Sequence, residues 1–195
     1  KLDDTIANYE KALTLQTDKK DIELVEDLAE CYHLKKDYPN ALKYYDEVLL
    51  VKKDDYDIRY NKALVLHAMK EYNDAAAIYT QLLTEKDNPN IQTNLTAALV
   101  SLGDEYLQAH NYSLATETFE RAIERGTKDS YAYYGLAKSY RACGIDDKAA
   151  EYYEKAISME PEKVEYSNEF AEFISSTQKT ADVKTDTQPA EIKEV

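Results

Sequence analysis

An alanine that returns at nearly constant spacing is the feature that most constrains this chain. The four alanines are Ala41, Ala75, Ala115 and Ala149, separated by 34, 40 and 34 residues. Four residues after each comes an aromatic side chain, at Tyr45, Tyr79, Phe119 and Tyr153. Side chains three and four residues apart share one face of an α-helix, so the pattern predicts a repeated helical unit.

The same register extends backwards from each alanine. A small residue stands twelve positions earlier, at Ala29, Ala63, Gly103 and Ala137. Small residues let the two helices of one unit approach closely, while aromatic rings fill the space toward the next unit. We therefore interpret these alanines and tyrosines as packing residues. The chain has only 4 Gly and 4 Pro, which disfavours a turn-rich all-β fold.

The stretch 130–161 carries the fullest version of the pattern. Its marker residues are Tyr133, Leu136, Ala137, Tyr140, Gly144, Ala149, Tyr153, Ala156 and Pro161. It resembles the tetratricopeptide repeat (TPR) family, whose unit is a helix-turn-helix of 34 residues. The resemblance covers roughly residues 5–161. It implies an all-α fold, a right-handed superhelical solenoid of helix-turn-helix units with a C-terminal solvating helix.

We expect a TPR array over residues 1–175 and a disordered tail over 176–195. The expected parts are a partial unit at 3–16, full units at about 22–53, 56–87, 89–127 and 130–161, and a capping helix at 163–175. Asp21, Asp129 and Asn88-Pro89 predict helix starts. The capping helix is expected to turn Phe170 inward and Glu169 outward. Because residues 3–16 contain only a second helix and the chain starts at Lys1, we expect the natural N-terminus to lie upstream.

The third unit contains six extra residues, which predict a first helix that starts near Pro89 and is longer than its counterparts. Two interpretations stay open. The extension is either a tolerated insertion or a contact site formed by Asn90, Gln92, Thr93 and Asn94.

The resemblance also implies a concave groove, lined by the first helices, in which peptides lie. The groove residues placed by alignment are Glu23, Glu26, Asp27, Glu30, Asp57, Tyr60, Asn61, Leu64, Asp104, Tyr131, Tyr134, Lys138 and Arg141. The tyrosines among them are expected to be aromatic anchors, because they have no packing wedge to fill. Co-chaperone relatives hold peptide carboxylates with Lys and Asn where this chain has Glu26 and Glu30, so that ligand is not expected. The acidic run 21–30 is either a bed for a basic segment or only a solvated face.

Charge limits the class of partner. The chain has 24 Lys and Arg against 38 Asp and Glu, for a net charge of −14. Such a surface repels phosphate backbones, so no nucleic acid is expected, and it favours basic proteins or peptides. No apolar run approaches the ~20 residues that span a bilayer, so no direct membrane insertion is expected. We expect a cytoplasmic location.

Catalytic signals are weak. The chain shows no glycine-rich phosphate loop and no cysteine cluster, so we expect no enzyme activity, no cofactor and no metal. His33 and His67 with Glu30 are the one alternative for a metal site. The sequence therefore predicts a noncatalytic scaffold or adaptor that captures a basic or aromatic partner segment. The alternative is a regulatory arm of a larger enzyme or secretion machine. Self-association through the open N-terminal end is also possible.

Overall fold

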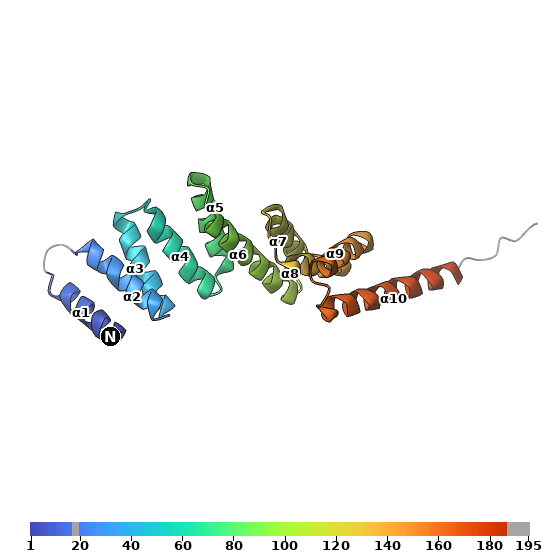
Figure 1. Ribbon diagram of the computed structural model, residues 1–195, viewed down its shortest axis with the longest axis horizontal. Coiled ribbons are helices and arrows are strands. Elements are labelled where there is room, and N and C mark those ends of the chain that lie inside the picture. Colours follow the sequence, from blue (N-terminus) through green and yellow to red (C-terminus); the bar gives the residue numbers. More distant parts are fainter. Residues whose placement is uncertain (17–19, 187–195) are drawn as a thin grey trace, which may run out of the picture. The chain divides into compact units, whose positions relative to one another are not determined.

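The structure, a computed structural model, describes residues 1–16 and 20–186, and the side chains up to residue 178. Over these residues the chain forms ten α-helices and no strand (Figure 1). The helices are α1 (Leu2–Thr14), α2 (Ile22–Leu34), α3 (Tyr38–Val51), α4 (Tyr56–Ala68), α5 (Tyr72–Glu85), α6 (Pro89–Gln108), α7 (Tyr112–Glu124), α8 (Ser130–Ala142), α9 (Asp146–Met159) and α10 (Val164–Asp186). The expected all-α class is confirmed.

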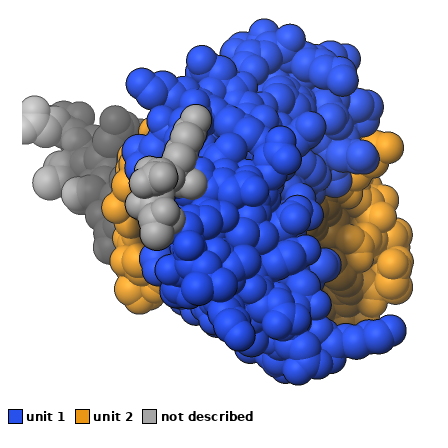
Figure 2. Space-filling view, turned by 90° about the vertical axis from the view of Figure 1, so that its left-hand side faces the viewer, with its two compact units in different colours: residues 1–102 blue, residues 103–195 orange. Residues whose placement is uncertain are grey.

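The chain divides into two compact units, residues 1–102 and residues 103–195, with the division inside α6 (Figure 2). In unit 1, α2 packs against α3 and α4 packs against α5, which gives two helix pairs. In unit 2, α8 packs against both α7 and α9, and α10 packs against α9. The pairs α2/α3, α4/α5 and α8/α9 each join a first helix to a second helix through a short turn, as the repeat predicted.

Side-chain caps fix the predicted helix starts. Asp21 accepts hydrogen bonds from the backbone N–H of Glu23 at 3.1 Å and of the residue after it at 3.3 Å. Asp129 accepts from the N–H of Tyr131 at 2.9 Å. Asn88 accepts from the N–H two residues on at 3.0 Å, directly beyond Pro89. These bonds satisfy N–H groups that have no partner within the helix, and the three predicted starts are confirmed.

Residues in the left-handed conformation end several first helices. Lys36, Lys70 and His110 have φ values of 62°, 67° and 58°, and Gly144 has a φ of 72°. The backbone N–H that follows Lys70 donates to the carbonyl of Leu66 at 2.9 Å, which closes the last turn of α4. Only glycine adopts this conformation without a steric cost, so three of these four turns use an unfavourable residue.

The repeated alanines and aromatic residues form the core. All four alanines of the first register and all four aromatic residues that follow them have 0% exposure. In unit 2, the ring of Phe119 lies against two glycines, and a Cβ atom on Gly135 would stand 2.3 Å from it. These observations agree with the packing role assigned to the repeat.

Two helices differ in length from their counterparts. The extra residues of the third repeat (89–127) lengthen α6 to 20 residues, against 13 in α2, α4 and α8, as predicted. The last helix was expected to end at 175, but α10 continues to Asp186. The added segment contains neither Gly nor Pro, so no residue stops the propagation of a helix that packing has already nucleated. Residues 187–195 of the expected tail lie outside the described residues.

No helix within residues 1–16 and 20–186 combines the length and the apolar character that crossing a bilayer requires.

Candidate functional site

In unit 1, the first helices α2 and α4 present a row of carboxylates. Glu23, Asp27 and Glu30 on α2 are exposed, and so is Asp57 on α4. Among the ion pairs formed by the described residues, none includes any of these four side chains. This part of the molecule therefore carries negative charge that its own cations do not offset.

Glu26 differs from the other predicted carboxylates of this face. Its Oε2 atom lies 2.6 Å from Nζ of Lys52, and both side chains are about one-third exposed at 28% and 34%. The hydrogen bond to Glu26 is the largest cause of the raised pKa of Lys52. Since this carboxylate already has a cation, it contributes less to binding a basic partner than Glu23 or Glu30.

Asp27 faces the neighbouring helix α1. Its negative charge is the main cause that raises the pKa of Tyr9, ahead of the smaller effect of burial. Asp27 thus lies at the edge of the carboxylate row.

The middle of the predicted groove in unit 1 is half-buried. The side chains of Tyr60, Asn61 and Leu64 are all half-buried. The hydroxyl of Tyr60 accepts a hydrogen bond from Nδ2 of Asn94 at 3.0 Å, and its ring centroid lies 6.2 Å from that of Tyr79. Asn94 belongs to the extended first helix α6, so one member of the predicted contact site is engaged inside unit 1.

The two histidines of this face pack against tyrosine rings. Nδ1 of His33 lies 3.3 Å from the hydroxyl of Tyr45, and the ring centroid of His67 lies 5.3 Å from that of Tyr72. Burial lowers the pKa of both histidines. Over the described residues, no three His, Cys, Asp or Glu side chains gather in a way that could hold a metal ion.

Unit 2 contains a hollow of about 570 Å³ beside α8. It is lined by Asp104, Leu107, Gln108, His110, Tyr112, Tyr131, Lys138, Arg141, Ala142 and Glu169. Four of the predicted groove residues are therefore brought together here. The alignment did not predict Gln108, His110 or Tyr112, which come from the end of α6 and the turn into α7.

Tyr131 forms one wall of this hollow. Its hydroxyl donates to Asp104, which also accepts a hydrogen bond from Nε2 of Gln108 at 2.6 Å. Burial, followed by the bond to Asp104, raises the pKa of Tyr131 well above its usual value. The half-buried ring stays in the lining, with a hydroxyl that is fixed in place.

Tyr134 is not an accessible anchor, and this prediction is wrong. Its side chain is 1% exposed and stacks on Tyr166 of α10 with a centroid distance of 4.3 Å. Its hydroxyl donates to Glu169. Helix α10 supplies the wedge that was assumed to be absent, because it packs where the first helix of a further unit would lie.

The predicted position of Glu169 is wrong. It was expected on the outer face of α10, but it accepts a hydrogen bond from Tyr153 at 3.2 Å and stands 3.5 Å and 3.6 Å from the cationic groups of Lys138 and Arg141. The repeat spacing could have identified the inward position of Glu169. Glu169 is 34 residues after Gly135, which packs against the preceding helix pair.

Comparisons with known proteins agree with the repeat. Sequence profiles described as "Tetratricopeptide repeat" match residues 33–99 and residues 100–163. The TPR repeat-containing protein MJ1428 of Methanocaldococcus jannaschii is 26% identical over 122 residues, which are 63% of this chain. The chain spans only 20% of the length of that relative.

Solved structures share the fold. A double mutant of MamA RS-1 matches with a TM-score of 0.55 at 20% identity, over 84% of this chain and 90% of that chain. YrrB, described as a TPR protein with an unusual peptide-binding site, matches with a TM-score of 0.55 at 20% identity, over 86% of this chain and 82% of that chain. The two adjoining profile matches, which together run from residue 33 to residue 163, show that this chain belongs to the tetratricopeptide repeat family.

Proposed function

We propose that this chain is a noncatalytic scaffold that binds a basic or aromatic segment of a partner protein along the first-helix faces of its units. The TPR fold is consistent with a protein-interaction scaffold. The peptide-binding site named for YrrB supports a peptide as the kind of ligand, although the likeness to that protein concerns the fold.

The observation that carries the proposal is the row of exposed carboxylates in unit 1. Glu23, Glu30 and Asp57 form no ion pair with any described residue. A lysine or arginine of a partner would gain attraction there without displacing an internal cation. The net charge of −14 would also steer basic partners toward the chain, at rates that fall as salt rises.

The hollow in unit 2 offers a different chemistry. Tyr131 supplies an aromatic wall, while Lys138 and Arg141, at 35% exposure each, already form ion pairs with Glu169. Here an aromatic residue of the bound segment would find a partner. The face of unit 1 therefore favours basic residues of a partner, and the hollow of unit 2 favours an aromatic residue.

The proposal is tested with a peptide array probed at low and at physiological salt. Basic-aromatic peptides should be captured, and capture should weaken as salt increases. The double variant Glu23→Lys/Glu30→Lys should lower the affinity about tenfold or more, since it reverses two charges of the face. Glu26 is left unchanged because its carboxylate already forms an ion pair with Lys52.

The matched control is Asp87→Lys/Glu117→Lys, which makes the same change in net charge at two exposed positions outside both faces. It should cost far less affinity than the first double variant. Equal losses in the two variants would show that binding follows net charge alone, and the first-helix face would then not be the site.

A further inference from the structure

Hollows of a second kind lie between consecutive second helices, and two of them, one in each unit, have a tyrosine of the later second helix in their lining. The one in unit 1 has a volume of about 420 Å³ and is lined by Glu10, Leu13, Thr14, Lys20, Lys43, Tyr44 and Glu47. The one in unit 2 has a volume of about 580 Å³ and is lined by Ile123, Tyr133, Glu151, Tyr152, Glu154, Lys155 and Ser158. Neither hollow shares a residue with the proposed first-helix faces.

The two hollows are equivalent in the repeat register and share one arrangement. In unit 1, the ring of Tyr44 stacks on Tyr32 with a centroid distance of 5.6 Å and an interplanar angle of 12°. Tyr32 donates its hydroxyl hydrogen to Glu10 of the preceding helix at 2.6 Å. This stacked pair fixes the tyrosine of the hollow in one orientation.

Unit 2 repeats this arrangement with its own residues. Tyr152 stacks on Tyr140 with a centroid distance of 5.7 Å and an angle of 20°, and Tyr140 donates to Glu120 of the preceding helix. A third ring joins them, since the centroid of Tyr133 lies 6.5 Å from that of Tyr152. The unit 2 hollow is therefore richer in aromatic surface than its counterpart.

The hollows differ in charge at one decisive position. In unit 1, Nζ of Lys43 stands 4.9 Å from the ring centroid of Tyr44, and Lys20 forms an ion pair with Glu47. The hollow in unit 1 thus carries its own lysine on its tyrosine. In unit 2 the residue equivalent to Lys43 is Glu151.

Unit 2 consequently has the tyrosine without a lysine at the position of Lys43, while Lys155 lines its hollow from one turn further along α9. Lys148 lies over Tyr140, 4.8 Å from its centroid, but in the described part of the chain no cation is stacked on Tyr152 or Tyr133. Glu151 and Glu154 are exposed and form no ion pair with described residues. Burial is the main cause that raises the pKa of Tyr152, and the charges of Glu151 and Glu120 raise it further, while Lys148 lowers it.

We propose that the hollow between α7 and α9 binds a lysine or arginine side chain of a partner protein, seated against Tyr152 and Tyr133 and paired with Glu151 and Glu154. The occupant takes the place that Lys43 fills in unit 1. A cation gains both the attraction of the aromatic rings and that of the two carboxylates. This second contact would lie outside the first-helix faces.

The test is an NMR titration of the ¹⁵N-labelled chain with hexalysine, and with acetylated hexalysine as the uncharged probe. Hexalysine should shift the backbone signals of Tyr133, Glu151 and Tyr152, and the acetylated peptide should not. Glu151→Lys rebuilds the unit 1 arrangement and should weaken the binding seen at these signals about tenfold. The reciprocal variant Lys43→Glu should make the signals around Tyr44 respond to hexalysine.

The control is Glu117→Lys, which makes the same charge change at an exposed position of α7 that does not line the hollow. The proposal is overturned if Glu151→Lys weakens these shifts no more than Glu117→Lys does, or if signals at this hollow do not move. The same titration tests the proposed function separately. Glu23→Lys/Glu30→Lys should reduce the shifts of α2 signals on adding hexalysine and should leave the shifts of Tyr152 unchanged.

Discussion

Single tyrosine hydroxyls in the core differ in whether they have a hydrogen-bond partner. Tyr79 and Tyr45 occupy the same place in successive repeats and are both 0% exposed. The hydroxyl of Tyr45 reaches His33 at 3.3 Å, whereas the buried hydroxyl of Tyr79 has no partner among the described residues. A buried polar atom without a partner lowers stability, because it has lost its water.

Tyr79→Phe should therefore leave the free energy of unfolding unchanged or raise it by up to about 1 kcal/mol, as it removes an unsatisfied hydroxyl. Tyr45→Phe is the matched variant and should lower it by about 0.5–1 kcal/mol, through the loss of the bond to His33. Urea unfolding followed by circular dichroism measures both. A larger loss for Tyr79→Phe than for Tyr45→Phe would contradict this account.

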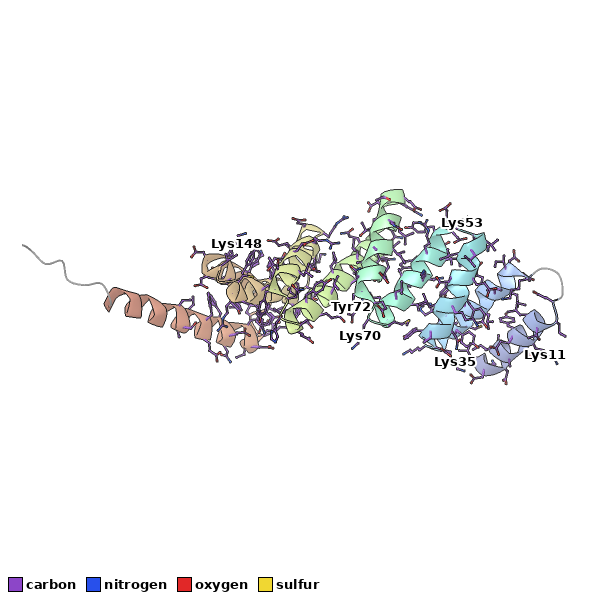
Figure 3. All side chains as sticks on the ribbon, turned by 180° about the vertical axis from the view of Figure 1, so that it is seen from behind. Lys11, Lys35, Lys53, Lys70, Tyr72 and Lys148 are labelled. Carbon is purple, nitrogen blue, oxygen red and sulfur yellow. The ribbon has the colours of Figure 1, made fainter. Side chains whose placement is uncertain are left out.

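The left-handed turn residues give a second prediction at this scale. Lys70 has a φ of 67° between α4 and α5 (Figure 3). Glycine at this position avoids the steric cost of Cβ, so Lys70→Gly should raise the free energy of unfolding by about 1 kcal/mol. Lys53, in the turn before α4, is not among the residues of positive φ. Lys53→Gly should bring no gain in urea unfolding, and a gain equal to that of Lys70→Gly would show that conformation is not the cause.

Among the helices, α10 depends on one carboxylate. Glu169 accepts hydrogen bonds from Tyr134 and Tyr153, and it lies near Lys138 and Arg141. Glu169→Gln keeps the shape of the side chain but removes the charge that these donors share. It should weaken the attachment of α10 by about 1–2 kcal/mol.

Hydrogen exchange measures that attachment. The amides of residues 164–178 should exchange about tenfold faster in Glu169→Gln, while those of α8 change less. Glu172→Gln, an exposed position on the same helix, is the control and should leave the exchange of α10 unchanged. Equal acceleration by both variants would mean that the helix responds to charge loss in general.

The elements show what a repeat register can and cannot predict. The caps at Asp21 and Asp129 and the longer first helix of the third unit follow from local sequence, and the structure confirms them. The end of α10 does not follow, because a polar segment without Gly or Pro is compatible with either a helix or a coil. Periodicity locates positions on a helix reliably, whereas the extent of a terminal helix depends on packing.

Residues that share one face of a first helix were predictable from the repeat spacing. Tyr131, Lys138 and Arg141 line one hollow as the alignment implied. Tyr134 was predicted incorrectly because its partner Tyr166 belongs to the next helix pair, outside the unit being aligned. The pairing of Glu26 with Lys52 was missed although both belong to one repeat, because the groove residues were placed from the first helices alone and Lys52 follows the end of α3.

Across the whole molecule, burial of tyrosine predicts how stability depends on pH. Four tyrosines are at most 1% exposed, and burial is the main cause that raises the pKa of each: Tyr45, Tyr79, Tyr134 and Tyr153. The pKa of Tyr153 rises to about 12. In the unfolded chain these hydroxyls titrate near their ordinary value of about 10.

The direction in which stability changes with pH follows from the pKa values in the folded and the unfolded chain. Below pH 10 both states are protonated, so the contribution to stability is complete. As the pH rises above 10, the unfolded chain releases protons while the folded chain retains them, and the folded state loses stability until its own tyrosines ionise. Each such tyrosine removes up to about 1.4 kcal/mol per pH unit, so four of them together remove several kcal/mol between pH 10 and 12.

Urea midpoints should therefore be similar at pH 7 and 9 and fall steeply above pH 10. Absorbance near 295 nm should show tyrosines of the folded chain that ionise only as it unfolds. Lysines also lose charge in this range, so the variant Tyr45→Phe/Tyr79→Phe separates the causes, and it should flatten the decline by about half if the four buried tyrosines dominate it. An unchanged decline in that variant would assign alkaline unfolding to charge repulsion in a chain that already carries −14.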